Sequence, residues 1–127
     1  MQPIVLASTS PYRKALLARL HLPFEVCAPD VDEAALPGES PRTTARRLAQ
    51  AKAEAVAARV PAAIVIGSDQ VADLDGAPLN KPGSHDAALA QLLQLQGRTA
   101  TFHTALAVAR DGGAHVEVDC VPTRVRF

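Results

Sequence analysis

Aromatic residues are scarce in this sequence: they make up 3% of its 127 residues, and tryptophan is absent. The core must therefore be built from the Ala, Val, Leu and Ile residues that dominate its 48% apolar content. No apolar run approaches the roughly 20 residues of a membrane-spanning helix. The start, M-Q-P-I-V-L-A, is too short for a signal peptide and lacks its basic residues. We therefore expect one cytoplasmic domain over residues 1–127, without a membrane partner.

The formal net charge of the chain is zero, because 13 Lys and Arg residues balance 13 Asp and Glu residues. This balance argues against a nucleic acid as partner, since binding by bulk charge needs an excess of basic residues. Cys27 and Cys120 are isolated, and the four histidines have no metal-ligand spacing. Neither a Walker glycine loop nor a G-x-S-x-G motif is present. Any anion site must therefore be local.

Short apolar runs alternate with helical patterns along the whole chain. We expect strands at residues 3–7, 24–28, 62–66, 71–74, 77–79, 99–109 and 115–127, and helices at 11–22, 41–60 and 84–97. The strand at 62–66 is the most apolar and is expected to be buried on both faces. Asp75-Gly76 predicts a hairpin turn. This order predicts an α/β fold with a mixed sheet and flanking helices.

The stretch A-S-T-S-P-Y-R-K, residues 7–14, begins a helix with two cations. Ser10 followed by Pro11 is typical of a helix start, yet Arg13 and Lys14 then fall in the first turn, where the helix dipole is already positive. A bound anion would explain them, held by Ser8, Ser10, Arg13 and backbone N–H groups. The alternative, favoured when this motif is taken alone, is a capped helix whose cations point into water.

Two charged residues fall where apolar ones are expected. Lys52 interrupts the apolar stripe of the helix at 41–60, in a chain with three lysines and ten arginines. It either extends its ammonium to solvent or supplies a compact charge to a site. Asp69, in G-S-D-Q, directly follows the most apolar strand. It is either a turn aspartate or a carboxylate at a strand end that takes a proton from water or holds a metal.

An acidic stretch and a further lysine complete the set of candidates. Asp30, Asp32 and Glu33 follow the second expected strand, and their oxygens suit magnesium or manganese, although surface loops are often acidic. Lys81, before Pro82, is a loop cation that indicates little alone. Taken together, the candidates favour a metal-assisted reaction of a phosphate ester or nucleotide.

Five segments in order resemble the Maf (septum formation) nucleotide pyrophosphatases: L-A-S-T-S-P-Y-R-K-A-L-L, V-D-E, R-L-A-Q-A-K-A, I-G-S-D-Q-V and N-K-P. The S-T-S-P and G-S-D-Q versions are similar to the branch that hydrolyses 7-methyl-GTP. The resemblance implies a two-lobed architecture shared with the inosine-triphosphate pyrophosphatases, with the site in a cleft between the lobes. It also implies hydrolysis between the α and β phosphates, giving 7-methyl-GMP and diphosphate.

The resemblance also implies a role for each candidate residue. Asp69 matches the catalytic proton acceptor and, with Glu33, would hold a divalent metal cation, Mg or Mn. Tyr12 and Gln70 fall at positions that distinguish substrates. Phosphate binding would fall to Ser8, Ser10, Arg13, Lys52 and Lys81. The expected partner is a small-molecule nucleotide, and a homodimer is compatible with the sequence.

The chain departs from the family in length. Family members are longer, and strand alternation is still running when this sequence stops, so we expect a C-terminally truncated chain. Three alternatives to 7-methyl-GTP hydrolysis stay open. One is a catalytically impaired nucleotide-binding remnant, another a pyrophosphatase of a different modified or non-standard nucleotide, and the third a small partner-binding α/β domain.

Overall fold

A computed structural model describes residues 2–127 of the chain. Its helices are α1 (Pro11–Ala18), α2 (Pro41–Arg59) and α3 (His85–Leu95), and its strands are β1 (Ile4–Ala7), β2 (Glu25–Cys27), β3 (Ile64–Leu74), β4 (Ala77–Leu79), β5 (Thr99–Arg110) and β6 (His115–Arg126). The hairpin at Asp75-Gly76 and the two long strands at the end of the chain are confirmed. All three helices begin where the Ser caps predict, since Ser10, Ser40 and Ser84 each accept a backbone N–H of the first turn.

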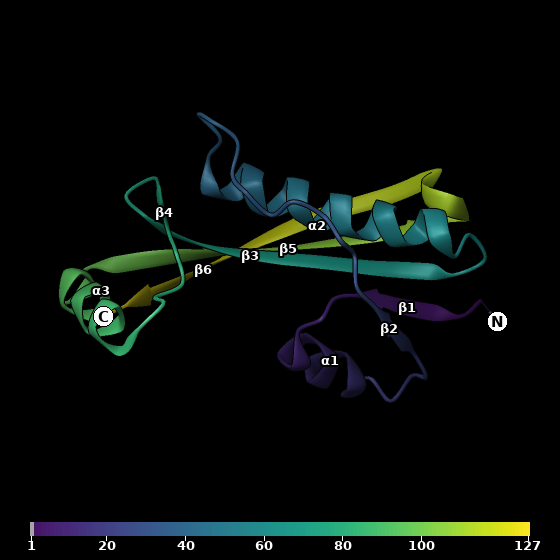
Figure 1. The fold of residues 1–127 in the computed structure, drawn as a ribbon, viewed down its shortest axis with the longest axis horizontal. Coiled ribbons are helices and arrows are strands. Elements are labelled where there is room, and N and C mark those ends of the chain that lie inside the picture. The colour runs from purple at the N-terminus through teal and green to yellow at the C-terminus, as the bar shows by residue number, and fades with distance from the viewer. Residues whose placement is uncertain (1) are drawn as a thin grey trace.

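The strands form one mixed sheet in the order β2-β1-β3-β5-β6, as the alternation of elements predicted. β1 runs parallel to β2 and β3, whereas β5 and β6 are antiparallel to their neighbours. The long strands β3, β5 and β6 cross the whole molecule, with β1 and β2 at one end and α3 at the other (Figure 1). No helix within residues 2–127 is long and apolar enough to cross a membrane.

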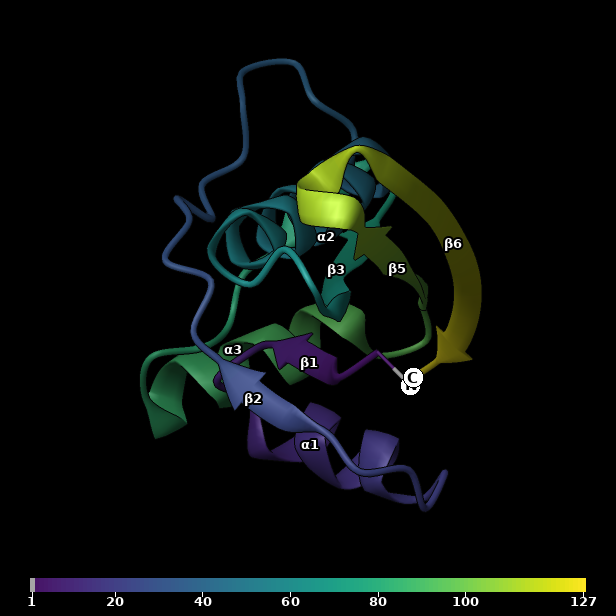
Figure 2. The same ribbon diagram turned by 90° about the vertical axis from the view of Figure 1, so that its right-hand side faces the viewer.

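Helix α2 packs inside the curve of the sheet, against β3 and β5 (Figure 2). The two surfaces meet through small residues: Ala45, Ala49 and Ala53 on the helix and Ala105, Ala107 and Ala109 on β5 are fully buried. Gly67 on β3 allows the closest approach, because a Cβ there would overlap the carbonyl oxygen of Ala49. Such close packing brings side chains of α2 within reach of polar groups on β3.

The other face of the sheet is less covered. Helix α1 lies on this side, beneath β1 and β2 (Figure 2), and none of its residues is buried. Val65 points to α2 and is fully buried, but Ile64 and Ile66 on the opposite face are half-buried. The expectation that residues 62–66 are buried on both faces is therefore wrong, because only one face has a closely packed helix.

The strand that carries Asp69 does not end before it, contrary to the sequence-based expectation. β3 runs without a break from Ile64 to Leu74, because β5 pairs with it from Val65 to Asp73. The pairing is interrupted on the opposite edge of β3. There β1 pairs with residues 64–67 and β4 pairs with residues 72–74. Within the described chain, no strand pairs with this edge over residues 68–71. We call this segment the β3 gap.

Candidate active site

The β3 gap presents two predicted site residues on opposite faces of the sheet, because successive side chains of a strand alternate. Asp69 points toward α2 and is 7% exposed. Gln70 points to the other face, where its Nε2 donates a hydrogen bond to Thr104 Oγ1 on β5 at 2.9 Å. Asp69 and Gln70 are adjacent in sequence, but their side chains lie on opposite faces of the sheet.

Lys52 does not extend to solvent. It is 4% exposed, and its Nζ lies 3.1 Å from Asp69 Oδ1 and 2.6 Å from Glu33 Oε1. The same ammonium donates to the carbonyl oxygen of Ser68 at 3.4 Å. One helix residue thus joins β3 to the acidic stretch that follows β2. The three side chains form the centre of the candidate site.

The two carboxylates of this cluster respond differently to their surroundings. Burial raises the pKa of Asp69 above its ordinary value, and the charge and hydrogen bond of Lys52 only partly oppose this effect. Glu33 is largely exposed, and the hydrogen bond from Lys52 holds its pKa below the ordinary value. The positive charge of Arg13 adds to the lowering of the Glu33 pKa and opposes part of the rise in the Asp69 pKa, so the start of α1 lies within electrostatic reach of the cluster.

The opening motif lies where β1 ends beside the β3 gap. Ser8 is buried, and its Oγ accepts the backbone N–H of Ser10 at 3.0 Å. Ser10 Oγ accepts the backbone N–H of Arg13 at 3.3 Å, which is the expected helix cap. In both contacts the serine oxygen is the acceptor, so each hydroxyl keeps its hydrogen for donation to an anion.

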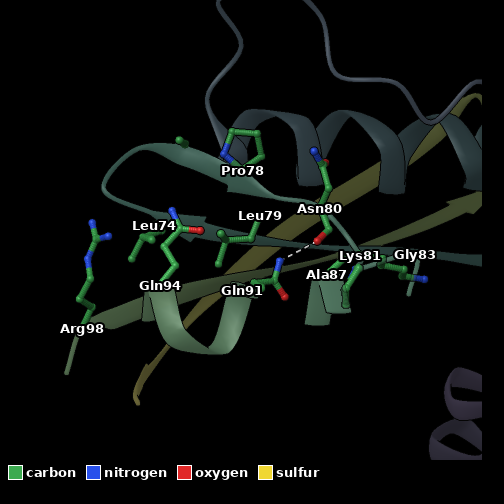
Figure 3. Close-up of a pocket in the computed structure, with 12 residues that line it drawn as sticks. Leu74, Pro78, Leu79, Asn80, Lys81, Gly83, Ala87, Gln91, Gln94 and Arg98 are labelled. Carbon is green, nitrogen blue, oxygen red and sulfur yellow. Dashed lines mark hydrogen bonds between the residues drawn. The ribbon is translucent and has the colours of Figure 1, made fainter. Parts of the chain in front are cut away.

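Tyr12 and Lys81 lie at the edge of the candidate site. The Tyr12 side chain at the start of α1 is 82% exposed. Lys81 follows β4 and lines a pocket of about 450 Å³ between β4 and α3, where Gln91 donates to the carbonyl of Asn80 (Figure 3). Its charge also lowers the pKa of Glu33. Lys81 is the only predicted site residue that lines this pocket, so the pocket adjoins the candidate site rather than containing it.

The structure shows an ion pair that no sequence pattern indicated. Arg47 Nε lies 2.7 Å from Glu39 Oε2, and Arg47 Nη2 lies 3.0 Å from Glu39 Oε1. Glu39 Oε1 also accepts the backbone N–H of Leu36 and the hydroxyl of Thr44. The pair ties the loop before α2 to the helix itself. Its only sequence signal is an acid just before a helix cap, which occurs in many helices.

The Glu39–Arg47 pair is expected to make the fold sensitive to acid. The hydrogen bond from Arg47 lowers the pKa of Glu39 from 4.5 to about 2. Because the folded pKa is depressed, the stabilisation is present above pH 4.5 and is lost as pH falls toward about 2. Urea unfolding across this range should show that the free energy of unfolding depends less on pH in Glu39→Gln than in wild type. Glu117→Gln, on exposed β6, is the control, and equal slopes for all three proteins would contradict the assignment.

Glu33 and Asp69 also fit a divalent cation that arrives with a phosphate ligand. Each places one oxygen against the Lys52 ammonium, which leaves its second carboxylate oxygen as a ligand for the cation. Among residues 2–127, no three His, Cys, Asp or Glu side chains gather closely enough to hold a metal by themselves. Magnesium commonly binds one or two carboxylates and completes its shell with water and substrate phosphates. The donor set matches that mode.

The predicted site residues differ in how close they lie to the cluster of Glu33, Lys52 and Asp69. Glu33, Lys52 and Asp69 are in contact, and Arg13 acts on both carboxylates. Ser8 and Ser10 lie at the adjoining strand end, and Lys81 at the other end of the β3 gap. Tyr12 and Gln70 lie outside the cluster, consistent with contacts to a different part of a ligand. The set comes from α1, α2 and β3 and from the loops that follow β1, β2 and β4.

Comparison with known proteins gives a consistent result. A family model described as Maf-like protein matches residues 3–127. The 7-methyl-GTP pyrophosphatase of Polaromonas sp. strain JS666 is 59% identical, over 99% of this chain and 58% of the relative. That of Albidiferax ferrireducens is 54% identical, over 98% of this chain and 62% of the relative. The chain thus spans about three fifths of the length of these curated relatives.

A solved structure supports the fold. The Staphylococcus aureus Ham1 protein superposes with a TM-score of 0.66 at 20% identity, over 97% of this chain and 70% of that chain. At this identity the likeness concerns the mixed α/β fold alone. The family match, in contrast, spans nearly the whole sequence and includes every residue of the Glu33–Lys52–Asp69 cluster. The chain belongs to the family of Maf-like proteins.

Proposed function

We propose that this protein hydrolyses 7-methyl-GTP to 7-methyl-GMP and diphosphate. The observation that carries the proposal is the buried Lys52, which holds Glu33 and Asp69 together beside the β3 gap. The names of the relatives that match nearly all of this chain agree with it. The ligand is then a small-molecule nucleotide. The free thiols of Cys27 and Cys120 support a reducing, cytoplasmic setting.

Asp69 acts as the proton acceptor in this proposal. A water oxygen attacks the α-phosphorus, Asp69 takes the proton, and the bond from the α-phosphorus to the oxygen bridging to the β-phosphate breaks. Diphosphate leaves with the electron pair of that bond. The raised pKa of Asp69 makes its carboxylate a stronger base than an exposed aspartate. Its burial beneath α2 keeps the carboxylate away from bulk water.

The cations stabilise the charge that develops on the phosphates. Ser8, Ser10 and Arg13 donate to phosphate oxygens at the start of α1, which answers why cations occur in its first turn. Lys52 and Lys81 offset the charge growing on the departing diphosphate. Glu33 and Asp69 would hold Mg or Mn, which, when bound, neutralises part of the triphosphate charge and polarises the phosphorus.

The direct test is incubation with 7-methyl-GTP and magnesium, followed by an assay for released diphosphate and by calorimetry of nucleotide binding. Release of diphosphate with formation of 7-methyl-GMP is the expected result. Binding without turnover would indicate a nucleotide-binding remnant. Neither binding nor turnover would favour a partner-binding domain, and faster turnover of another nucleotide would reassign the substrate.

Selectivity for the methylated base is expected to depend on Tyr12. Methylation at N7 gives guanine a positive charge, and an aromatic ring stacked on it gains about 1–2 kcal/mol in a partly desolvated site. This corresponds to roughly a five- to thirtyfold preference over GTP. Tyr12→Ala should erase most of the preference in kcat/KM, whereas Tyr12→Trp should keep or strengthen it. A preference unchanged in Tyr12→Ala would place the base elsewhere.

A further inference from the structure

We infer that Arg47 is a positioning residue that holds Glu33 against Lys52. The catalytic part of this inference rests on the proposed function, whereas the structural part does not. Arg47 makes no hydrogen bond or ion pair with Glu33 or Asp69, although its charge interacts with that of Asp69 at longer range. It acts through the backbone next to Glu33, in the loop between β2 and α2.

Glu33 is not held in place by packing. Its side chain is 63% exposed, and its carboxylate contacts the Lys52 ammonium at 2.6 Å. The Lys52 end of this ion pair is buried, but the Glu33 end is in water, where fixing a long, mobile side chain costs entropy and the solvent screens its charge. A defined position for this carboxylate therefore requires that the backbone carrying it be fixed.

Arg47 fixes that backbone at the next residue. Its Nη2 donates to the carbonyl oxygen of Ala34 at 2.9 Å. The guanidinium is itself oriented by the two-point contact with Glu39, whose side chain is 6% exposed. Glu39 in turn accepts the N–H of Leu36. The planar guanidinium can bind a carboxylate and a carbonyl at once, which an ammonium does less well.

The anchor and the ammonium belong to one rigid element. Arg47 and Lys52 both lie on α2, so their separation is set by helix geometry rather than by the loop. The loop is thus attached to α2 at Ala34 while Glu33 reaches Lys52. Without the first attachment, Glu33 is tied to α2 by its contact with Lys52, because the remaining hydrogen bond of Ala34, from its N–H to Asp32 Oδ1, lies within the loop itself. We therefore expect the Glu33 carboxylate to lose its fixed position when Arg47 is replaced.

The same loop offers a matched control at its other end. Arg59, at the end of α2, donates to the carbonyl oxygen of Ala28 at 2.6 Å and lies 3.9 Å from Asp30. It is also an arginine that binds a loop carbonyl, but it is farther from Glu33 along the chain. If Arg47 acted only by general anchoring of the loop, Arg59→Gln would have a similar effect.

The experiment compares Arg47→Gln with Arg59→Gln in hydrogen exchange and in kinetics with 7-methyl-GTP. Arg47→Gln should speed exchange of the amides at residues 33–36 and lower kcat roughly 10- to 100-fold, as for residues that orient metal ligands. KM should change less than kcat. Arg59→Gln should leave amide exchange and kcat nearly unchanged. Arg47→Lys should have a kcat between those of Arg47→Gln and wild type. Thermal unfolding verifies that each variant is folded.

A double-mutant comparison tests the route through Glu33. In a Glu33→Gln background, Arg47→Gln should cause little further loss of kcat, because the group it positions is already gone. Additive losses, or unchanged exchange at residues 33–36, would overturn the inference. A wild-type chain without turnover would overturn the proposed function instead. The exchange result would then still decide whether Arg47 fixes the loop.

Discussion

Asp69→Asn is expected to retain most of the affinity for nucleotide and to lose about a hundred- to ten-thousandfold in turnover. The amide has nearly the same shape as the carboxylate, and its oxygen can still accept the hydrogen bond from Lys52 Nζ. It cannot take a proton from water, and it lacks the charge that would bind a cation. The fold should therefore survive while the chemical step fails.

The measurement is kcat for 7-methyl-GTP, together with the Kd of the nucleotide from calorimetry. Asp73→Asn is the matched control. Asp73 lies four residues farther along β3 and also has polar partners, since it accepts the N–H of Gly76 and contacts His103 Nε2. Turnover should be far less affected in this variant. Near-normal turnover in Asp69→Asn would remove Asp69 from the mechanism.

Lys52→Met is expected to destabilise the fold by about 3 kcal/mol at neutral pH, because it leaves the buried Asp69 carboxylate without its partner. Methionine fills a similar volume, so a packing defect contributes little. Adding Asp69→Asn should recover much of the loss, since the uncompensated charge is then removed. Urea unfolding of the two single variants and the double variant gives the coupling.

The pH dependence of this loss follows from the sign of the Asp69 shift. Without Lys52 the folded-state pKa of Asp69 rises further above its unfolded value. The loss of unfolding free energy in Lys52→Met should therefore be largest at pH values where Asp69 of the folded variant is ionised. It should shrink as pH falls through the raised pKa of Asp69 in that variant. Lys14→Met, on exposed α1, is the control. A comparable loss in that variant would argue against a buried pair.

Local features of the fold were predictable because they depend on neighbours in sequence. The helix starts at Ser10, Ser40 and Ser84 depend on a hydroxyl that meets an N–H three residues later. The hairpin at Asp75-Gly76 likewise follows from two residues that adopt positive φ. The continuity of β3 through G-S-D-Q was not predictable from sequence, since it depends on pairing with β5, which lies some 35 residues farther along the chain.

The sequence suggested candidate residues for the site but not how they are arranged in space. Lys52 interrupts an apolar stripe whether it reaches solvent or a partner, and only the packing of α2 on β3 through Gly67 decides between them. The contact between Arg47 and Ala34 depends on the path of an irregular loop. No periodicity encodes that path, so sequence patterns offered no sign of it.

The alternation of side chains along β3 has a consequence for protein engineering. Asp69 and Gln70 are adjacent in sequence but face opposite sides of the sheet, the first toward Lys52 and the second toward Thr104. A mutant library at Gln70 and Thr104 would therefore remodel one surface while the other keeps its contacts. If Gln70 contacts the base and Asp69 takes the proton, as proposed, such a library should change base preference while turnover is retained.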